Sequence, residues 1–234
     1  MLNQFSRTQL LYGKEAMEKL KNSCVAIFGL GGVGGYVGEA LARSGIGSFD
    51  LIDDDKICLT NLNRQIIATF DTVGQYKTDV MKERMLKINP KVNIQTHQCF
   101  FLPENASDFS FEDYDYIIDA MNTVESKLLL IENAKISKTP IISCMSTDDR
   151  MDPSKLEIMD ISRSVLCPIA KQIRTKLRKK GIRKVKVLSS REKISDIQLH
   201  GSISFMPGAA GMMLAGVVVK DLLGKSDRKH RYKK

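Results

Sequence analysis

The stretch CVAIFGLGGVG, residues 24–34, contains the strongest fold signal in this chain of 234 residues. Its first part, CVAIFG, is a short, continuous apolar run of the kind found in buried parallel strands. Its second part, GLGGVG, places glycines where the strand would turn into a helix. Glycines there let the backbone approach a phosphate, and the helix N-terminus supplies N–H donors and a positive dipole. The stretch therefore predicts a strand–turn–helix unit that binds a nucleotide.

Strand and helix signals alternate after this unit. The helix in VGGYVGEALARSGIG is expected to end at Gly45 and Gly47, and the helix in KTDVMKERMLKINP to stop before Pro90. Strands are expected in SFDLIDDD, KVNIQTHQ, DYIIDA and PIISCM, and a further helix in ESKLLLIENAKIS. This alternation predicts an α/β fold with a Rossmann-like, doubly wound, mostly parallel sheet.

The last third of the chain is expected to form a C-terminal extension of the same domain. It contains a strand-like KLEIMDI, a basic helix around residues 168–180, the segments RKVKVLSS and SISFM, and an apolar helix in GAAGMMLAGVVVKDLLG. That last helix is too short and too rich in glycine to span a bilayer, so it is expected to pack back on the sheet. We divide the chain into a nucleotide-binding core with an N-terminal arm, residues 1–150, and a basic part, residues 151–234, with a disordered tail.

The charge of the chain is concentrated in that basic part. Residues 1–150 contain 16 Lys+Arg and 20 Asp+Glu, whereas residues 151–234 contain 20 Lys+Arg and 7 Asp+Glu. The excess lies in KQIRTKLRKKGIRKVKVLSSREK and in the tail KSDRKHRYKK. Such asymmetry favours a polyanionic partner, although a solvated helix face with a frayed tail would give the same pattern.

Several protein classes are disfavoured by composition. No apolar run approaches the roughly 18–20 residues of a membrane span, and the N-terminus lacks the apolar segment of a signal peptide. We therefore expect a cytoplasmic protein with no membrane partner. The five cysteines are scattered, which excludes a CxxC redox pair or zinc clamp.

Polar residues downstream of the glycine turn favour ATP over a dinucleotide. Asp53 ends the second expected strand, about 20 residues on, where a carboxylate binds ribose hydroxyls. Asn61, Arg64, Gln65 and Lys77 follow it. An enzyme that cleaves ATP needs cations because charge builds on the phosphates as pyrophosphate leaves, whereas a hydride-transfer enzyme does not. Arg64 can hold phosphate through two nitrogens, and Lys77 is a movable point charge.

In this order, GLGGVG, LIDDD, TNLNRQ, VGQYK and DAMN resemble the ubiquitin-activating-enzyme-like (ThiF/MoeB-type) adenylyltransferases. The stretches FSRTQLLYG, RSGIGSFDLIDDD, DRMDPSKLEIMDI, CPIAKQIRTKLRKKGI and GSISFMPGAAGMMLAG are similar to the tRNA-modifying branch of this family. The resemblance implies an ATP-binding adenylation core. It also implies ATP-dependent dehydration, by cyclisation through an acyl-adenylate, of threonylcarbamoyladenosine in the tRNA anticodon loop.

The same resemblance implies a role for each site residue. Arg64, Lys77 and Arg7 would be catalytic, with Arg7 crossing a homodimer to reach the neighbouring subunit's ATP. Mg²⁺ would be held by the acid that ends the fourth expected strand, Asp119. The remaining nucleotide-binding residues would be Gly29, Gly31, Gly32 and Gly34 at the phosphates, Asp53 at the ribose, and Asn61 and Gln65 at the triphosphate.

Two departures from the family pattern affect the metal site. The family has a second acid where this chain has Asn122, and an amide oxygen is a weaker Mg²⁺ ligand than a carboxylate. The family also has a GTGN-like turn where residues 146–149 read STDD. Either Asp148 or Asp149 compensates by supplying charge to the site, or catalysis is impaired.

Two alternative functions stay open on this sequence. The chain could adenylate the C-terminus of a ubiquitin-like or sulfur-carrier protein, although the basic charge and the missing CxxC pairs count against this. It could also be a non-catalytic relative weakened by Asn122. A dehydrogenase is disfavoured by the cations that follow Asp53.

Overall fold

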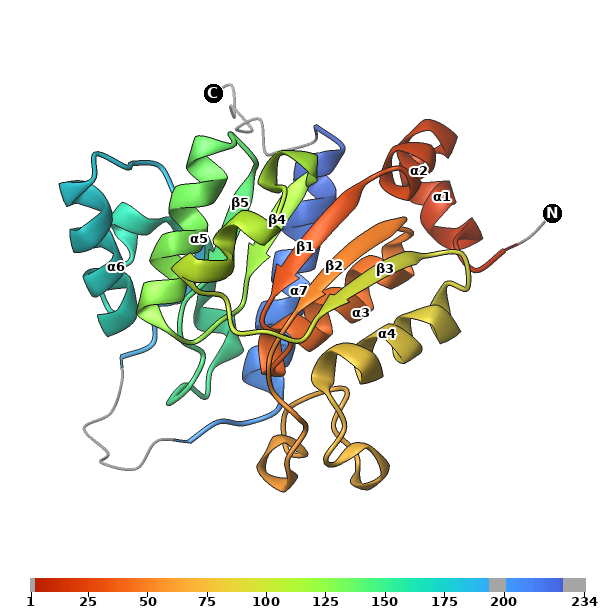
Figure 1. The fold of residues 1–234 in the computed structure, drawn as a ribbon, viewed down its shortest axis with the longest axis horizontal. Coiled ribbons are helices and arrows are strands. Elements are labelled where there is room, and N and C mark those ends of the chain that lie inside the picture. Colours follow the sequence, from red (N-terminus) through yellow and green to blue (C-terminus); the bar gives the residue numbers. More distant parts are fainter. Residues whose placement is uncertain (1–2, 194–200, 225–234) are drawn as a thin grey trace, which may run out of the picture.

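A seven-stranded sheet forms the centre of the computed structural model, which describes residues 3–193 and 201–224 (Figure 1). The strands lie in the order β3-β2-β1-β4-β5-β7-β6, and only the pairing of β6 with β7 is antiparallel within these residues. The strands are β1 (Cys24–Phe28), β2 (Ser48–Ile52), β3 (Asn93–His97), β4 (Tyr116–Asp119), β5 (Ile141–Cys144), β6 (Leu156–Asp160) and β7 (Lys186–Ser190). The expected mostly parallel α/β fold is confirmed.

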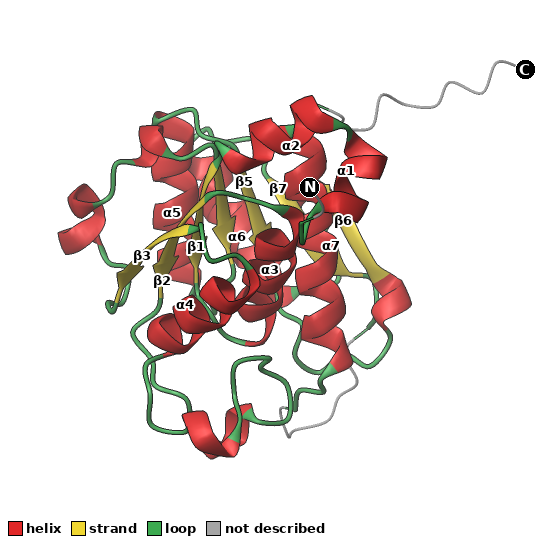
Figure 2. Cartoon of the chain, turned by 90° about the vertical axis from the view of Figure 1, so that its right-hand side faces the viewer, coloured by secondary structure: helices red, strands yellow, loops and turns green. Residues whose placement is uncertain are grey.

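Helices cover both faces of the sheet (Figure 2). One face is covered by α3 (Gly32–Ser44), α4 (Lys77–Ile88) and α7 (Phe205–Leu222), and the other by α5 (Val124–Ile136) and α6 (Pro168–Lys179). Two short helices, α1 (Ser6–Tyr12) and α2 (Lys14–Lys21), precede β1. Short 3₁₀ helices span Leu59–Asn61, Phe70–Thr72, Pro103–Asp108, Phe111–Asp113, Pro153–Lys155 and Ile161–Arg163.

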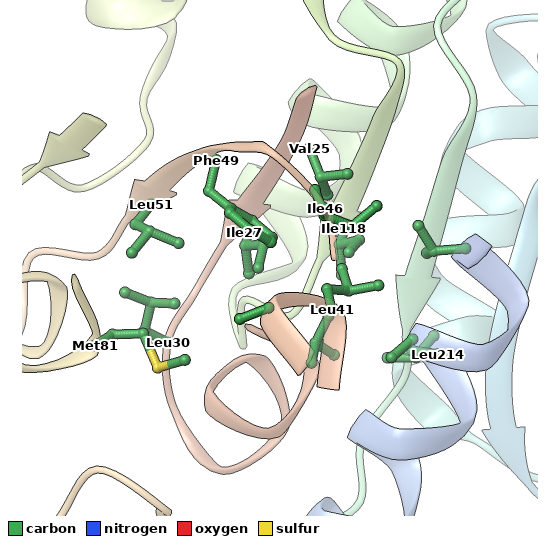
Figure 3. Close-up of a cluster of buried hydrophobic side chains, with 14 of the residues drawn as sticks. Val25, Ile27, Leu30, Leu41, Ile46, Phe49, Leu51, Met81, Ile118 and Leu214 are labelled. Atoms are coloured by element: carbon green, nitrogen blue, oxygen red, sulfur yellow. The ribbon is translucent and has the colours of Figure 1, made fainter. Parts of the chain in front are cut away.

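Because successive strand residues point to opposite faces, the apolar run of β1 contributes to two core layers. Figure 3 shows the layer beneath α3, α4 and α7. Its labelled side chains are Val25, Ile27, Leu30, Leu41, Ile46, Phe49, Leu51, Met81, Ile118 and Leu214. On the other face Phe28 packs against Phe101 and Phe109, with ring centroids 5.0 and 5.5 Å away. Burial on both faces explains why β1 is continuously apolar.

The C-terminal helix starts earlier than the sequence pattern indicated. It begins at Phe205, so the end of SISFM forms its first turn. By length and composition α7 could cross a membrane, but more than half of it is buried inside this structure. A Cβ at Gly211 would lie 2.6 Å from Cβ of Tyr36, which shows how closely α7 approaches α3.

The C-terminal strands β6 and β7 belong to the same sheet as β1, the strand that precedes the glycine turn. The proposed division of the chain at residue 150 stays a prediction. The expected disordered tail, residues 225–234, lies outside the described residues.

Candidate active site

A cleft of about 450 Å³ lies where β1, β2, β4 and β5 end. Its walls come from the turn after β1, the end of β2 and the loops after β4 and β5, and Pro207 of α7 also lines it. The carboxyl ends of strands in an open α/β sheet are the usual place for a ligand. The volume is in the range of small-molecule and cofactor sites.

The glycine turn after β1 has no room for side chains at two positions. Gly29 has φ +92°, and a Cβ there would lie 2.6 Å from the Ala120 carbonyl oxygen. A Cβ at Gly34 would lie 1.8 Å from the Gly29 carbonyl oxygen. Gly29, Gly31 and Gly32 line the cleft, whereas Gly34 packs the start of α3 behind it. The turn therefore offers bare backbone to a ligand at a helix N-terminus, as a phosphate requires.

Asp53 and Lys77 form a buried charged group at the end of β2. The Asp53 carboxylate accepts hydrogen bonds from the backbone N–H groups of Leu30 (2.6 Å) and Asp55 (2.9 Å). The Lys77 Nζ lies 3.6 Å from Asp53 Oδ1 and 2.5 Å from Asp55 Oδ2. Burial raises the pKa of Asp53, and the ammonium of Lys77 opposes that rise. This pairing holds a lysine cation at the cleft wall while its side chain stays buried.

The segment around the Leu59–Asn61 turn supplies the remaining predicted phosphate ligands. Asn61, Arg64 and Gln65 all line the cleft. Nη1 of Arg64 donates to the Thr60 carbonyl oxygen (2.6 Å) and to Asn63 Oδ1 (3.0 Å), so the guanidinium is oriented by its own loop. The Gln65 side-chain oxygen is buried and has no hydrogen-bond donor among the described residues.

The structure places Asp119 behind the cleft wall. Its carboxylate is fully buried, 3.0 Å from Lys127 Nζ and 2.5 Å from the Ser143 hydroxyl. Lys127 also donates to the Cys144 carbonyl oxygen at 2.7 Å, and Lys127 itself lines the cleft. The sequence interpretation missed Lys127. A lysine beside the apolar run LLLI, in the helix that follows a strand-end acid, was the available signal.

Oxygen donors for a metal lie on two walls of the cleft. Asp53, Asp54 and Asp55 have ligand atoms within 4.8 Å of one another, and Lys77 pairs with two of them, Asp53 and Asp55. On the opposite wall, Asn122 and Asp148 line the cleft. Amide and carboxylate oxygens suit a hard cation such as Mg²⁺, so the donor set fits the implied metal.

Arg7 is the predicted catalytic residue that lies away from the cleft. It is exposed on α1, which leads into the N-terminal end of β1, at the opposite edge of the sheet (Figure 1). Phe5, at the start of α1, packs near Gly45, which precedes β2. Within one chain Arg7 is thus separated from the other site residues.

Comparison with known proteins gives consistent matches over nearly the whole chain. The ThiF family model matches residues 5–234. A tRNA threonylcarbamoyladenosine dehydratase of Bacillus subtilis is 42% identical, over 95% of this chain and 96% of its own. The Escherichia coli enzyme of the same name, solved in complex with ATP, superposes with a TM-score of 0.90 at 31% identity, covering 95% of this chain and 94% of the other.

A relative that has a different name matches a smaller part of the chain. An adenylyltransferase and sulfurtransferase of Ogataea parapolymorpha is 34% identical over 61% of this chain and 38% of its own.

Proposed function

This chain belongs to the ThiF family, and we propose that it is an ATP-dependent tRNA-modifying enzyme that dehydrates threonylcarbamoyladenosine. A carboxylate oxygen of the threonylcarbamoyl group attacks the α-phosphorus of ATP, and pyrophosphate leaves. The neighbouring carbamoyl group then attacks the activated carbonyl carbon and loses a proton. AMP leaves with the former carboxylate oxygen, so the ring closes with net loss of water.

The observation that most supports this function is similarity over both whole chains to a dehydratase, combined with a cleft built for a nucleotide. The match to the Bacillus subtilis enzyme includes the basic C-terminal part as well as the nucleotide-binding part. The cleft joins the glycine turn, Asp53, Arg64 and Lys77. Threonylcarbamoyladenosine contains both the carboxylate and the nucleophile, so positioning suffices and no catalytic cysteine is needed.

Each group in the cleft has a physical role in this reaction. The bare backbone of the glycine turn binds phosphate, and Asp53 accepts hydrogen bonds from the ribose. Lys77 and Arg64 stabilise the negative charge that builds as pyrophosphate leaves. Asn122 is one of the residues that would hold Mg²⁺, which would neutralise phosphate charge.

The enzyme is proposed to act as a homodimer in the cytoplasm, with Arg7 reaching the partner's cleft. Two exposed apolar side chains on α7 support a subunit contact: Phe205 and Met212 are each 47% exposed and lie seven residues apart, two turns along one face of the helix. Light scattering at micromolar concentration tests the dimer, and a monomer would contradict it.

Subunit mixing tests Arg7. Arg7→Ala and Lys77→Ala proteins should each lose most of their activity. In a two-fold dimer, mixing them should recover roughly a quarter of full activity, because half the dimers are mixed and each contains one intact site. No recovery would assign Arg7 to its own subunit or to no catalytic role.

The reaction itself is tested with purified protein, ATP·Mg²⁺ and tRNA that contains threonylcarbamoyladenosine. We expect AMP and pyrophosphate to form together with a nucleoside that is lighter by one water in mass spectrometry. Unmodified tRNA and a carrier protein with a free C-terminus serve as controls. Absence of both AMP and the lighter nucleoside would contradict the function, and pyrophosphate exchange with the carrier protein alone would favour protein adenylation.

A further inference from the structure

The loops after β4 and β5 are neighbours at the C-terminal edge of the sheet. The two strands pair in parallel, with Asp119 opposite Ser143. Asn122 lies in the loop after β4, and Asp148 lies in the loop after β5. Both residues line the same cleft, so they form one wall, which we call the β4–β5 wall.

The carboxylates around this wall differ in what they already bind. Asp119 is committed to Lys127 and Ser143 behind the wall. Asp149 lies outside the cleft lining and accepts a hydrogen bond from the Gly201 N–H at 2.9 Å. Asp148 is exposed, and its carboxylate forms no hydrogen bond or ion pair with any of residues 3–193 and 201–224.

The geometry of the loop explains why these adjacent acids face different ways. Asp149 adopts a left-handed backbone, with φ 59°, and its N–H donates to the Gly201 carbonyl oxygen. Asp148 precedes this turn, and its own N–H donates to the Ser146 hydroxyl at 3.2 Å. The turn therefore ties Asp149 to the segment before α7 and leaves Asp148 at the cleft.

The lysine nearest this wall is already paired with Asp119, so the charge of Asp148 is available to a ligand in the cleft. Lys127 is the cation at the base of the wall, and Asp119 already neutralises it at 3.0 Å. Burial raises the pKa of the Cys144 thiol to about 12; Lys127 opposes this, and Asp119 and Asp148 add to it. The negative charge of Asp148 therefore acts on the Cys144 thiol, at the end of β5.

We propose that Asp148 supplies the carboxylate ligand for the divalent cation that enters with ATP, with the Asn122 amide oxygen as its weaker neighbour. The inference rests on the proposed use of ATP. A hard cation needs anionic oxygen beside the phosphates, and on the β4–β5 wall this chain offers that oxygen from the loop after β5. Asn122 therefore does not make the protein non-catalytic, because the acid is supplied by the adjacent loop.

The test measures metal binding directly, with Mn²⁺ as the probe and a non-hydrolysable ATP analogue. Mn²⁺ affinity is read by electron paramagnetic resonance on the full chain. Asp148→Asn should weaken Mn²⁺ binding at least about tenfold, since loss even of an outer partner of a metal ligand costs that much. The exchange Asp148→Asn with Asn122→Asp should restore the affinity, and Asn122→Asp alone should raise it.

Asp149→Asn is the matched control, because it makes the same chemical change one residue away and should leave Mn²⁺ affinity unchanged. Analogue binding in EDTA and the melting temperature report whether each variant retains the folded site. Equal Mn²⁺ affinity in Asp148→Asn and the unaltered protein would overturn the proposal, as would failure of the exchange to restore it or loss of analogue binding in EDTA.

The two proposals can fail separately. Retained Mn²⁺ affinity in Asp148→Asn, together with normal AMP formation on modified tRNA, would remove Asp148 from the metal site and leave the proposed function standing. Weakened Mn²⁺ binding in Asp148→Asn without any reaction on modified tRNA by the unaltered protein would leave the metal ligand standing and remove the proposed substrate.

Discussion

Lys77 and Arg64 have similar proposed roles but different surroundings. Lys77 is 4% exposed and held between Asp53 and Asp55, whereas Arg64 is half-buried and held by backbone and amide oxygens of its own loop. A buried cation paired with carboxylates is costly to remove, because the partner charges lose their compensation. Loss of Lys77 should therefore affect both catalysis and the Asp53 carboxylate, whose pKa would rise further.

We expect Lys77→Ala and Arg64→Ala each to lose roughly 2–4 kcal/mol of transition-state stabilisation, as removal of one preorganised donor does. Single-turnover AMP formation with modified tRNA measures this. Lys56→Ala is the matched control, since Lys56 is exposed in the same segment and lies over the Tyr76 ring, 4.7 Å from its centroid. Unchanged turnover in either cleft variant would contradict the role assigned to it.

Arg150 is a buried guanidinium whose nitrogens lack hydrogen-bond acceptors among the described residues. It is 2% exposed, and none of its three side-chain nitrogens has a hydrogen-bond acceptor in the described part of the chain. Replacing such a group by an apolar side chain of similar volume often stabilises a protein. Arg150→Met should raise the unfolding free energy by about 1–2 kcal/mol, or roughly 2–8 °C in melting temperature.

Calorimetry on Arg150→Met and on Arg163→Met gives the comparison. Arg163 is exposed, so its replacement should change the unfolding free energy by less than about 0.5 kcal/mol. A lower melting temperature for Arg150→Met would show that this guanidinium has an acceptor in the assembled protein.

Among the elements, α3 and α4 are joined by an ion pair at their contact. Glu39 of α3 is 5% exposed in its side chain and accepts hydrogen bonds from Nε of Arg84 on α4 (2.6 Å) and Nε of Arg43 (2.8 Å). Burial alone would raise the pKa of Glu39, but the two guanidinium groups outweigh it and hold the pKa below 4.5. Since α4 begins at Lys77, this pair helps to fix the helix that presents the lysine we propose to be catalytic.

A depressed pKa in the folded state adds stability above the unfolded pKa, and this stability is lost as pH falls through the folded value. Glu39→Gln should therefore lower the unfolding free energy by about 1–2 kcal/mol at pH 7, as expected for hydrogen bonds to partly exposed charged groups. The difference from the unaltered protein should shrink as pH falls below 4.5. Urea unfolding across this pH range measures it, with the exposed Glu83→Gln as control; a constant difference would contradict the linkage.

At the scale of the whole molecule, the basic side chains of α6 lie apart from the cleft. The cleft lies at the carboxyl edge of the sheet. Helix α6 lies on the face of the sheet opposite α7 (Figure 2), and its last turn contains Lys176, Arg178 and Lys179. Lys176 and Lys180 are paired with Glu125 and Glu132. Lys171, Arg178 and Lys179 are exposed and take part in none of the ion pairs found within residues 3–193 and 201–224. This unpaired set is the surface we expect to contact tRNA phosphates.

Replacing Lys171, Arg178 and Lys179 together by Ala should weaken tRNA binding and reduce the slope of log affinity against log salt by up to about 3, because each phosphate contact releases roughly one counterion. ATP affinity should not change. Filter binding at several salt concentrations measures the slope. Lys176→Ala is the control, since its charge is already paired, and an unaltered slope in the triple variant would place the tRNA elsewhere.

Local sequence patterns were sufficient for most of the elements and for the nucleotide turn. Short local patterns predicted the glycine turn at Gly29 and Gly34, the buried strand β1 and the strand-end acid Asp53. They were sufficient because backbone crowding and strand burial act over a few residues. The order of the motifs also predicted a shared site for Asn61, Arg64, Gln65 and Lys77, and all four line the cleft. The start of α7 was misplaced because a run as short as SISFM shows no periodicity that distinguishes a strand from a helix.

Contacts between distant segments decided the rest. Asp119 lies behind the cleft because Lys127 and Ser143, from the following helix and the next strand, take its oxygens. Asp148, and not Asp149, reaches the cleft because Gly201 binds its neighbour. The sequence alone predicted a nucleotide site at the carboxyl edge of the sheet. It also showed that Asn122 replaces an acid of the family pattern. Which acid faces the cleft depends on strand pairing and on a loop more than 50 residues away, so only the folded chain determines it.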